Sequence, residues 1–195
     1  MAVTLPHPDE CFAVAVDVQP RLLGAYPPAR ARRLVDGVSF ALEALGVLGV
    51  PALLLELEPD KLGPVHPHVQ EAAGGAAPIS KVWYDATREP AFLGAVEDLG
   101  RRTALVLGIE AHVCVLHTAA GLVDRGLQVH YLVDAVASRD AEDEAVGRRL
   151  MEAAGVRPLS TETLLFGALE SSRHPRFREV LGVIKEYLAA GPRRR

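Results

Sequence analysis

Runs of consecutive apolar residues alternate along the chain with longer segments in which apolar residues recur at every third or fourth position. A continuous apolar run is typical of a strand covered on both faces, whereas the longer spacing is typical of a helix with one buried face. Strands that alternate with helices predict parallel strands joined by crossover helices. The pattern therefore predicts an α/β protein with three layers, α/β/α, in which the middle layer is a six-stranded, mainly parallel, Rossmann-like sheet.

The limits of the elements follow from where the apolar runs begin and end. We expect six strands, at residues 11–18, 52–57, 79–82, 103–108, 128–133 and 156–160. We expect five or six helices, of which five have clear limits, at residues 29–48, 89–99, 113–125, 140–154 and 175–188. With 195 residues the chain is predicted to form one domain, residues 1–195, with frayed tails at 1–10 and 191–195.

Composition narrows the classes of function. Hydrophobic residues make up 49% of the chain and charged residues 24%, which predicts a large core and excludes disorder for the bulk of the protein. The net charge of -4 provides no positive surface for a phosphate backbone, so nucleic acid is not an expected partner. Two cysteines allow at most one disulfide, and no apolar run or signal-like start points to a membrane or to export. We therefore expect a cytoplasmic protein without a membrane segment.

Three reactive side chains fall at the carboxyl ends of predicted strands, the edge at which open parallel sheets bind ligands. Asp17 ends the first strand, Lys81 lies in the third, and Cys114 follows the fourth at the start of a helix. The first turn of a helix lowers the pKa of a thiol, so the cysteine is a candidate nucleophile, with a carboxylate to take its proton and an ammonium to favour the thiolate. Position alone leaves open a small buried cysteine, a capping aspartate and a solvated lysine.

The local sequence around these residues narrows the choice. The three segments are Ala15-Val-Asp-Val-Gln19, Ile79-Ser-Lys81 and Gly108-Ile-Glu-Ala-His-Val-Cys-Val115. Further distinctive sequence motifs lie at residues 122–130, 134–139 and 174–177. Together they resemble the isochorismatase-like cysteine hydrolases, and most closely the small isochorismatase-domain-containing proteins. The resemblance extends from about Phe12 to Leu188.

The resemblance implies a catalytic triad of Asp17, Lys81 and Cys114. In this family pattern the cysteine attacks a carbonyl carbon, the aspartate acts as general base and then protonates the leaving group, and the lysine holds the arrangement of charges. The resemblance also implies an oxyanion hole made by the backbone N–H groups of Glu110 and Cys114, with a cis peptide bond between Ile109 and Glu110.

Three further residues are candidates for substrate binding. Gln19 completes the Asp-x-Gln motif after the first strand. Trp83 and Tyr84 follow the lysine closely and could form a wall against a planar substrate. As aromatic residues in a chain rich in aliphatic side chains, they could equally lie in the core or at a subunit interface.

No metal or other cofactor is expected. The nicotinamidase branch of the family carries an Asp-x-His motif, whereas the second strand here runs into Glu56-Leu-Glu58. His66 and His68 lack a clear third ligand nearby. His117 shares a helical face with Cys114, so a Cys/His pair is conceivable, but a packing role for the histidine is favoured.

These observations lead to one functional hypothesis and two alternatives. The hypothesis is a metal-independent cysteine hydrolase that cleaves a small amide, carbamoyl or related acyl substrate through a thioester-type intermediate. The first alternative is isochorismatase or nicotinamidase activity on the same fold; isochorismate hydrolysis cleaves an enol ether and needs no thiol, which argues against it. The second is a non-catalytic, oligomeric binding or scaffold protein. The family pattern also implies a homodimer or homotetramer. The C-terminal helix carries an apolar stripe that fits either a subunit contact or packing on the chain's own sheet; its residues are Phe177, Val180, Leu181, Ile184 and Leu188.

Overall fold

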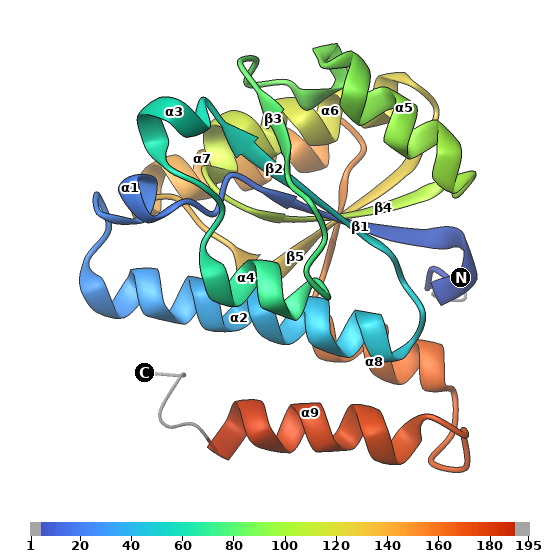
Figure 1. Ribbon diagram of the computed structural model, residues 1–195. Helices are drawn as coiled ribbons and strands as arrows, with labels where there is room; N and C mark the ends of the chain where they lie inside the picture. Colours follow the sequence, from blue (N-terminus) through green and yellow to red (C-terminus); the bar gives the residue numbers. More distant parts are fainter. Residues whose placement is uncertain (1–4, 190–195) are drawn as a thin grey trace.

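The computed structural model describes residues 5–189, and its strands form one six-stranded sheet in the order β3-β2-β1-β4-β5-β6 (Figure 1). The strands are β1 (Cys11–Val16), β2 (Ala52–Leu57), β3 (Ile79–Lys81), β4 (Thr103–Gly108), β5 (Gln128–Val136) and β6 (Arg157–Leu159). Every neighbouring pair in this sheet is parallel. The predicted α/β class with a six-stranded parallel sheet is therefore confirmed.

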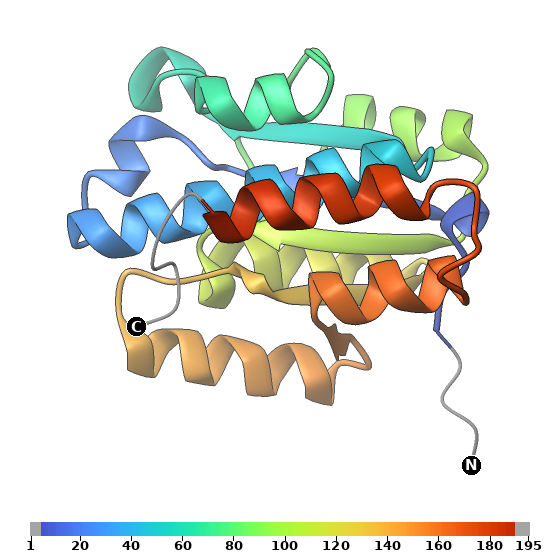
Figure 2. The same ribbon diagram turned by 90° about the horizontal axis from the view of Figure 1, so that it is seen from below.

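Helices cover both faces of the sheet, which gives three layers. The α-helices are α1 (Pro20–Leu23), α2 (Pro28–Val47), α3 (Pro59–Leu62), α4 (Pro67–Ala72), α5 (Pro90–Leu99), α6 (Leu116–Asp124), α7 (Ala141–Ala153), α8 (Thr161–Leu169) and α9 (Phe177–Ala189). Short 3-10 helices span Pro8–Glu10 and Ala86–Arg88, and a π-helical turn spans Ala111–Val115. Helices α5 and α6 lie on one face, α2 and α8 lie on the other, and α9 lies outside α2 (Figures 1 and 2).

The sequence pattern missed four helices, for two reasons. Helices α1, α3 and α4 are only one or two turns long and lie in segments rich in proline; each begins with a proline, which fits a first helical position because its missing N–H would have no partner there. Helix α8 carries consecutive apolar residues instead of a helical stripe. Its signal is the cap, since the Ser160 side chain accepts a hydrogen bond from the Thr163 N–H.

Strand β5 continues three residues beyond its predicted end at residue 133, to Val136. Its pairing with β4 shifts register between Val106 and Gly108, which marks a bulge or similar irregularity. The polar residue Asp134 within this stretch concealed the continuation. The longer strand brings the backbone of residues 133–137 beside helix α2.

The C-terminal helix α9 packs on other helices and not on the sheet. Its buried residues Val180 and Ile184 join a small separate core with Phe40 of α2 and Leu165 of α8, while Leu188 of the predicted stripe is exposed. The interpretation of the stripe as packing on the sheet is therefore wrong, because α2 and α8 already cover that face. The ring of Tyr187 stacks on Phe40 with centroids 4.2 Å apart, which strengthens the contact between α9 and α2.

Part of the N-terminal segment that we expected to fray is ordered. Pro8–Glu10 form a 3-10 helix in which Pro8 is buried. The Arg101 guanidinium holds this segment by donating hydrogen bonds to the carbonyls of Pro8 (2.9 Å) and Cys11 (2.7 Å). The other predicted frayed residues, 1–4 and 191–195, lie outside the described residues. No helix within residues 5–189 is long and apolar enough to cross a membrane.

Candidate active site

Asp17 is placed by the central strand β1, all six residues of which are buried. Its φ of 51° lies in the left-handed region, which is uncommon outside glycine and is tolerated best by Asn and Asp. The Asp17 N–H donates to the Leu55 carbonyl (3.1 Å), and the Asp17 carbonyl accepts from the Gln19 N–H (2.8 Å). These two bonds fix the carboxylate at the carboxyl edge of the sheet.

Lys81 reaches this carboxylate from β3. The Lys81 Nζ donates to Asp17 Oδ2 at 2.7 Å and to the Trp83 carbonyl at 3.1 Å. Both charged side chains of the pair are 0% exposed. The alternative of a solvated lysine is therefore excluded. A fully buried ion pair of this kind depends on both partners, because removing one leaves an uncompensated charge away from water.

Cys114 lies in the π-helical turn that precedes α6, and it is 4% exposed. Burial raises the pKa of its thiol, and the negative charge of Asp17 raises it further, against the smaller opposing influence of Lys81. The expectation of a pKa lowered by a helix start is wrong, because loss of solvation and a neighbouring carboxylate outweigh the helix. The thiol is thus protonated at neutral pH.

The Asp17 carboxylate has one oxygen engaged and one spare. Lys81 occupies Oδ2, while Oδ1 is buried and accepts no hydrogen bond from the described residues. Burial raises the pKa of this carboxyl group, whereas Lys81 and the nearby Cys114 thiol both lower it. The result is a carboxylate with raised basicity, next to a protonated thiol, with an acceptor atom available.

The turn after β4 brings a row of backbone groups beside the cysteine. Gly108 has a φ of 113°, and any Cβ at this position would overlap the Val16 carbonyl, so only glycine fits. The peptide bond between Ile109 and Glu110 is cis, at the position that the family resemblance implies. The Glu110 carbonyl accepts from the Val115 N–H (3.2 Å), but the Glu110 N–H has no acceptor among the described residues. That N–H is available to a ligand.

The Gln19 side chain is engaged by backbone groups at the end of β2 and in the loop after it. Its Oε1 accepts from the Leu57 N–H (2.8 Å), and its Nε2 donates to the carbonyls of Leu57 (3.0 Å) and Gly63 (2.5 Å). Both N–H donors of the amide are therefore used, and the residue is fully buried. Its structural task is to hold the loop after β2 against the end of β1.

Trp83 and Tyr84 are not core residues, since they are 42% and 59% exposed. The Arg88 guanidinium lies 3.9 Å from the centroid of the Trp83 ring, a cation–π contact that orients the indole. With Val82 they form an exposed apolar group directly after Lys81. The alternatives of a substrate wall and a subunit contact both remain compatible with this exposure.

The histidines form no metal centre in the structure. Across residues 5–189, no group of three or more His, Cys, Asp or Glu side chains is arranged to hold a metal ion. The Nδ1 of His66 instead accepts from the His68 N–H and caps helix α4. His117 is exposed on α6, so the packing role that we favoured for it is wrong.

Glu56, a residue to which the sequence pattern gave no role, lies beside the ion pair. Its carboxylate accepts from the Ser80 hydroxyl (2.8 Å) and the Val65 N–H (3.4 Å), and its charge contributes to the raised pKa of Asp17. An acidic residue inside an otherwise apolar strand was the available signal. Its relation to Asp17 could not be read from the sequence, because it depends on how β2 pairs with β1 and β3.

Comparison with known proteins identifies the family. The Isochorismatase domain model matches residues 12–163. Isochorismatase domain-containing protein 2A of Mus musculus is 34% identical over 155 residues, which cover 79% of this chain and 73% of the relative. The solved structure of the MAR1 ribonuclease from Caenorhabditis elegans has a TM-score of 0.85 and 28% identity, covering 93% of each chain.

Two more distant structures share the fold. The YcaC gene product of Escherichia coli, described as an octameric hydrolase of unknown specificity, has a TM-score of 0.81 and 16% identity, covering 98% of this chain and 100% of that one. N-carbamoylsarcosine amidase from Thermoplasma acidophilum has a TM-score of 0.66 and 20% identity, covering 78% and 97%. The match of the family model to most of the chain shows that this protein belongs to the isochorismatase domain family.

Proposed function

We propose that this protein is a metal-independent cysteine hydrolase that cleaves a small amide, carbamoyl or related acyl compound. Family membership supports a hydrolase. The observation that carries the finer proposal is the unoccupied, buried oxygen of Asp17 beside the protonated thiol of Cys114, with Lys81 bound to the other oxygen.

The first half of the reaction forms an acyl-enzyme. As the Cys114 sulfur attacks the carbonyl carbon, its proton passes to Asp17 Oδ1, and the carbonyl oxygen becomes an oxyanion. The backbone N–H groups of Glu110 and Cys114 would hold that oxyanion; such donors are each worth about 2.7–4 kcal/mol in related chemistry. The C–N bond then breaks, Asp17 returns the proton to the leaving nitrogen, and a thioester remains on the cysteine.

The second half restores the enzyme. Asp17 takes a proton from a water molecule as that water attacks the thioester carbon. The carbon–sulfur bond breaks, the acid is released, and the proton returns to the thiol. The raised pKa of both groups fits this scheme, because a more basic carboxylate can take the proton during attack, with no thiolate needed beforehand.

Lys81 has a separate task in this proposal. Burial disfavours the charged form of a carboxylate, and a protonated carboxyl group cannot act as a base. The 2.7 Å contact with the ammonium favours the charged form of Asp17 against the effect of burial, and the bond to the Trp83 carbonyl fixes the direction of the ammonium. Lys81 is thus proposed to set the charge of the base and not to contact the scissile bond.

The small exposure of Cys114 supports a small substrate. Trp83 and Tyr84 are proposed to line its approach, since they are exposed directly after Lys81. The amidase from Thermoplasma acidophilum has this fold, as does the ribonuclease from Caenorhabditis elegans. We do not propose RNA cleavage, because the net charge of -4 offers no general attraction for a polyanion.

We further propose a single-domain, cytoplasmic homo-oligomer, a dimer or a tetramer. The exposed apolar group Val82-Trp83-Tyr84 supports a subunit contact. Light scattering coupled to gel filtration tests this. A monomer at micromolar concentration would contradict it, and Trp83→Ala should shift the mass toward the monomer if this group is the contact.

The decisive experiment traps the acyl-enzyme. The purified protein, treated with EDTA, is incubated with primary amides, N-carbamoyl amino acids, nicotinamide, isochorismate and an RNA oligonucleotide, and product release and intact mass are followed. We expect turnover of an amide or carbamoyl compound and an acyl adduct on Cys114, both lost in Cys114→Ala and both kept in Cys11→Ala.

Three outcomes would overturn the proposal. Turnover that persists in Cys114→Ala would show that Cys114 is not the nucleophile. Activity that EDTA abolishes and zinc restores would exclude a metal-independent mechanism. Cleavage of RNA or isochorismate alone, with no adduct from any amide, would assign a different reaction to the same fold.

A further inference from the structure

The segment that follows Lys81 packs on the helix that follows Cys114. Strand β3 ends at Lys81, whose Nζ donates to the Trp83 carbonyl (3.1 Å). Helix α6 begins two residues after Cys114, and the 3-10 helix of the segment at residues 82–88 contacts it. The contacts between this segment and α6 therefore bear on how far the ammonium lies from the thiol.

One hydroxyl of α6 binds the segment at two backbone atoms. Thr118 lies four residues after Cys114 and is 0% exposed. Its hydroxyl donates to the Tyr84 carbonyl (3.3 Å) and accepts from the Ala86 N–H (3.1 Å). A hydroxyl has one proton to donate and lone pairs to accept, so this single group satisfies both backbone atoms. A valine of nearly the same shape would leave both without this partner.

Gly121 of α6 and Arg125 at the end of the helix support the same contact. A Cβ at Gly121 would lie 2.5 Å from the Thr87 hydroxyl and 2.7 Å from the Asp85 carboxylate, so a side chain there would push the segment away. Arg125 Nη2 donates to the Thr87 carbonyl (2.9 Å). Positions 118, 121 and 125 follow one another at helical spacings of three and four, which places them on one face. That face of α6 receives the segment after Lys81.

These contacts form a continuous path between the thiol and the ammonium. The path runs from Cys114 along the helix to Thr118 and across to the segment after Lys81. Through the Trp83 carbonyl it reaches the ammonium, which binds Asp17 at 2.7 Å. We propose that Thr118 is a positioning residue, whose hydroxyl fixes Lys81 relative to the thiol. The purpose of this positioning rests on the proposed hydrolase, in which Lys81 sets the charge of the base.

The alkylation rate of Cys114 tests the positioning role without any substrate. The full chain, in a Cys11→Ala background, is treated with iodoacetamide at about pH 9. Lys81 lowers the pKa of the Cys114 thiol, so an ammonium that moves away leaves less thiolate. Thr118→Val should slow alkylation about threefold, the effect of about half a pKa unit, whereas Thr118→Ser should keep the parent rate. A merely loosened structure would do the opposite, since it would expose the thiol and speed the reaction.

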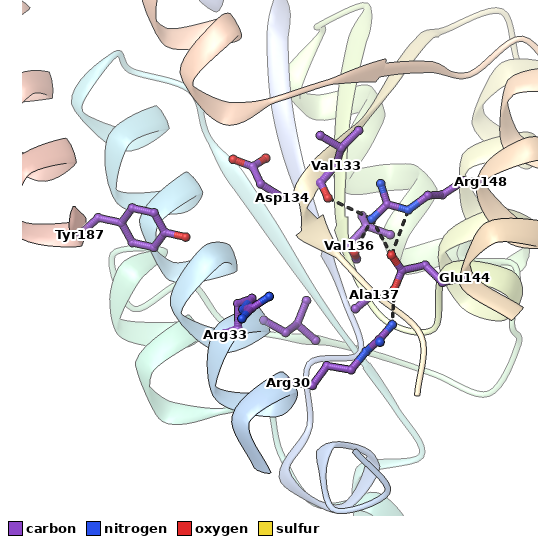
Figure 3. Close-up of a pocket in the computed structure, with 10 residues that line it drawn as sticks. Arg30, Arg33, Val133, Asp134, Val136, Ala137, Glu144, Arg148 and Tyr187 are labelled. Carbon is purple, nitrogen blue, oxygen red and sulfur yellow. Dashed lines mark hydrogen bonds and ion pairs between the residues drawn. The ribbon is translucent and has the colours of Figure 1, made fainter. Parts of the chain in front are cut away.

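Thr161→Val is the matched control. The Thr161 hydroxyl donates to Asp134 Oδ1 (3.0 Å), and this threonine is also 0% exposed. Asp134 lines the cavity drawn in Figure 3, to whose lining Asp17, Lys81 and Cys114 do not contribute. Alkylation of the Thr161→Val variant should proceed at the parent rate.

A double-variant cycle with Lys81→Met shows whether Thr118 acts through the lysine. Thr118→Val should have no further effect in that background, because the group it positions is gone. Circular dichroism checks the fold of each variant, and if Lys81→Met does not fold, the three threonine variants decide. The proposal is overturned if Thr118→Val leaves the rate unchanged or raises it, if Thr161→Val slows alkylation as much, or if Thr118→Val acts equally with and without Lys81. Because alkylation needs no substrate, a failure to find turnover would not affect this result.

Discussion

Two ion pairs of nearly equal length occupy very different surroundings in this protein. The Lys81–Asp17 pair measures 2.7 Å with both side chains 0% exposed, whereas the Arg30–Glu144 pair measures 2.6 Å with side chains 32% and 19% exposed. In the first pair each charged group has one oppositely charged partner, whereas in the second Glu144 is shared between Arg30 and Arg148. Distance alone therefore says little about an ion pair. Burial and the number of alternative partners decide how much stability the protein loses when the pair is broken.

The largest difference should appear in stability when one partner of the buried pair is removed. Asp17→Asn or Lys81→Met leaves an unpaired charge or dipole in the core and should cost about 3–5 kcal/mol of unfolding free energy, as measured by urea denaturation. The double variant should recover much of this loss, because no lone charge remains, while staying inactive. A double variant no more stable than either single one would contradict this account of the pair.

The rigidity of the candidate site can be tested at Gly108. Gly108→Ala places a Cβ against the Val16 carbonyl at a φ of 113°, so the backbone conformation alone should cost about 1–3 kcal/mol, with further loss from the overlap. Denaturation and the alkylation rate of Cys114 should both change. Gly126→Ala is the control: its φ is 83°, but a Cβ added there would meet no other residue within 4 Å beyond its chain neighbours, so only the conformational cost should appear, with Cys114 unaffected.

The electrostatics of the buried region predict opposite effects on the thiol. The rate of Cys114 alkylation, measured against pH in a Cys11→Ala background, should rise only above the ordinary thiol pKa of about 8.5. Asp17→Asn removes a negative neighbour and should lower that pKa, whereas Lys81→Met should raise it. Cys11 is removed because its own thiol, whose pKa burial raises to about 12, would add a second alkylation reaction at high pH. A thiol pKa below 8.5, or unmoved by both changes, would disprove the charge arrangement.

The smallest effect should come from the partly exposed pair. Arg30→Gln should cost no more than about 1 kcal/mol in urea denaturation, because water screens the pair and Glu144 retains Arg148. A loss as large as that of Lys81→Met would remove the contrast between the two ion pairs.

Much of the fold was predictable because its signals are local. Strands β1, β2 and β4 appear as uninterrupted apolar runs, and their predicted ranges differ from the observed ones by no more than two residues. Helix α8 was missed because its apolar residues are consecutive and show no helical spacing, and the extension of β5 was missed because a single aspartate looks like a strand end. The surface on which the apolar stripe of α9 packs depended on α2, which lies far away in the sequence, as well as on the preceding helix α8.

In the candidate site, too, some features could be predicted from the sequence and others could not. The positions of Asp17, Lys81 and Cys114 at strand ends could be read from the chain, because each lies beside its own apolar run. The protonation of the thiol could not, because desolvation and the charge of Asp17 act across the sheet. The motif around Gln19 suggests a substrate contact, whereas its hydrogen bonds to the carbonyls of Leu57 and Gly63 form only in the folded chain.

The order of residues was sufficient to predict the fold class, the order of the elements and which reactive groups stand at the sheet's carboxyl edge, since all three depend on residues close together along the chain. Which groups are charged, which donors lack acceptors and where cavities lie emerged only when the chain was folded. The Arg30–Glu144 ion pair is the clearest case, because the two residues are 114 positions apart. Solvation and Coulomb interactions depend on distance in space, and a linear sequence does not contain that distance.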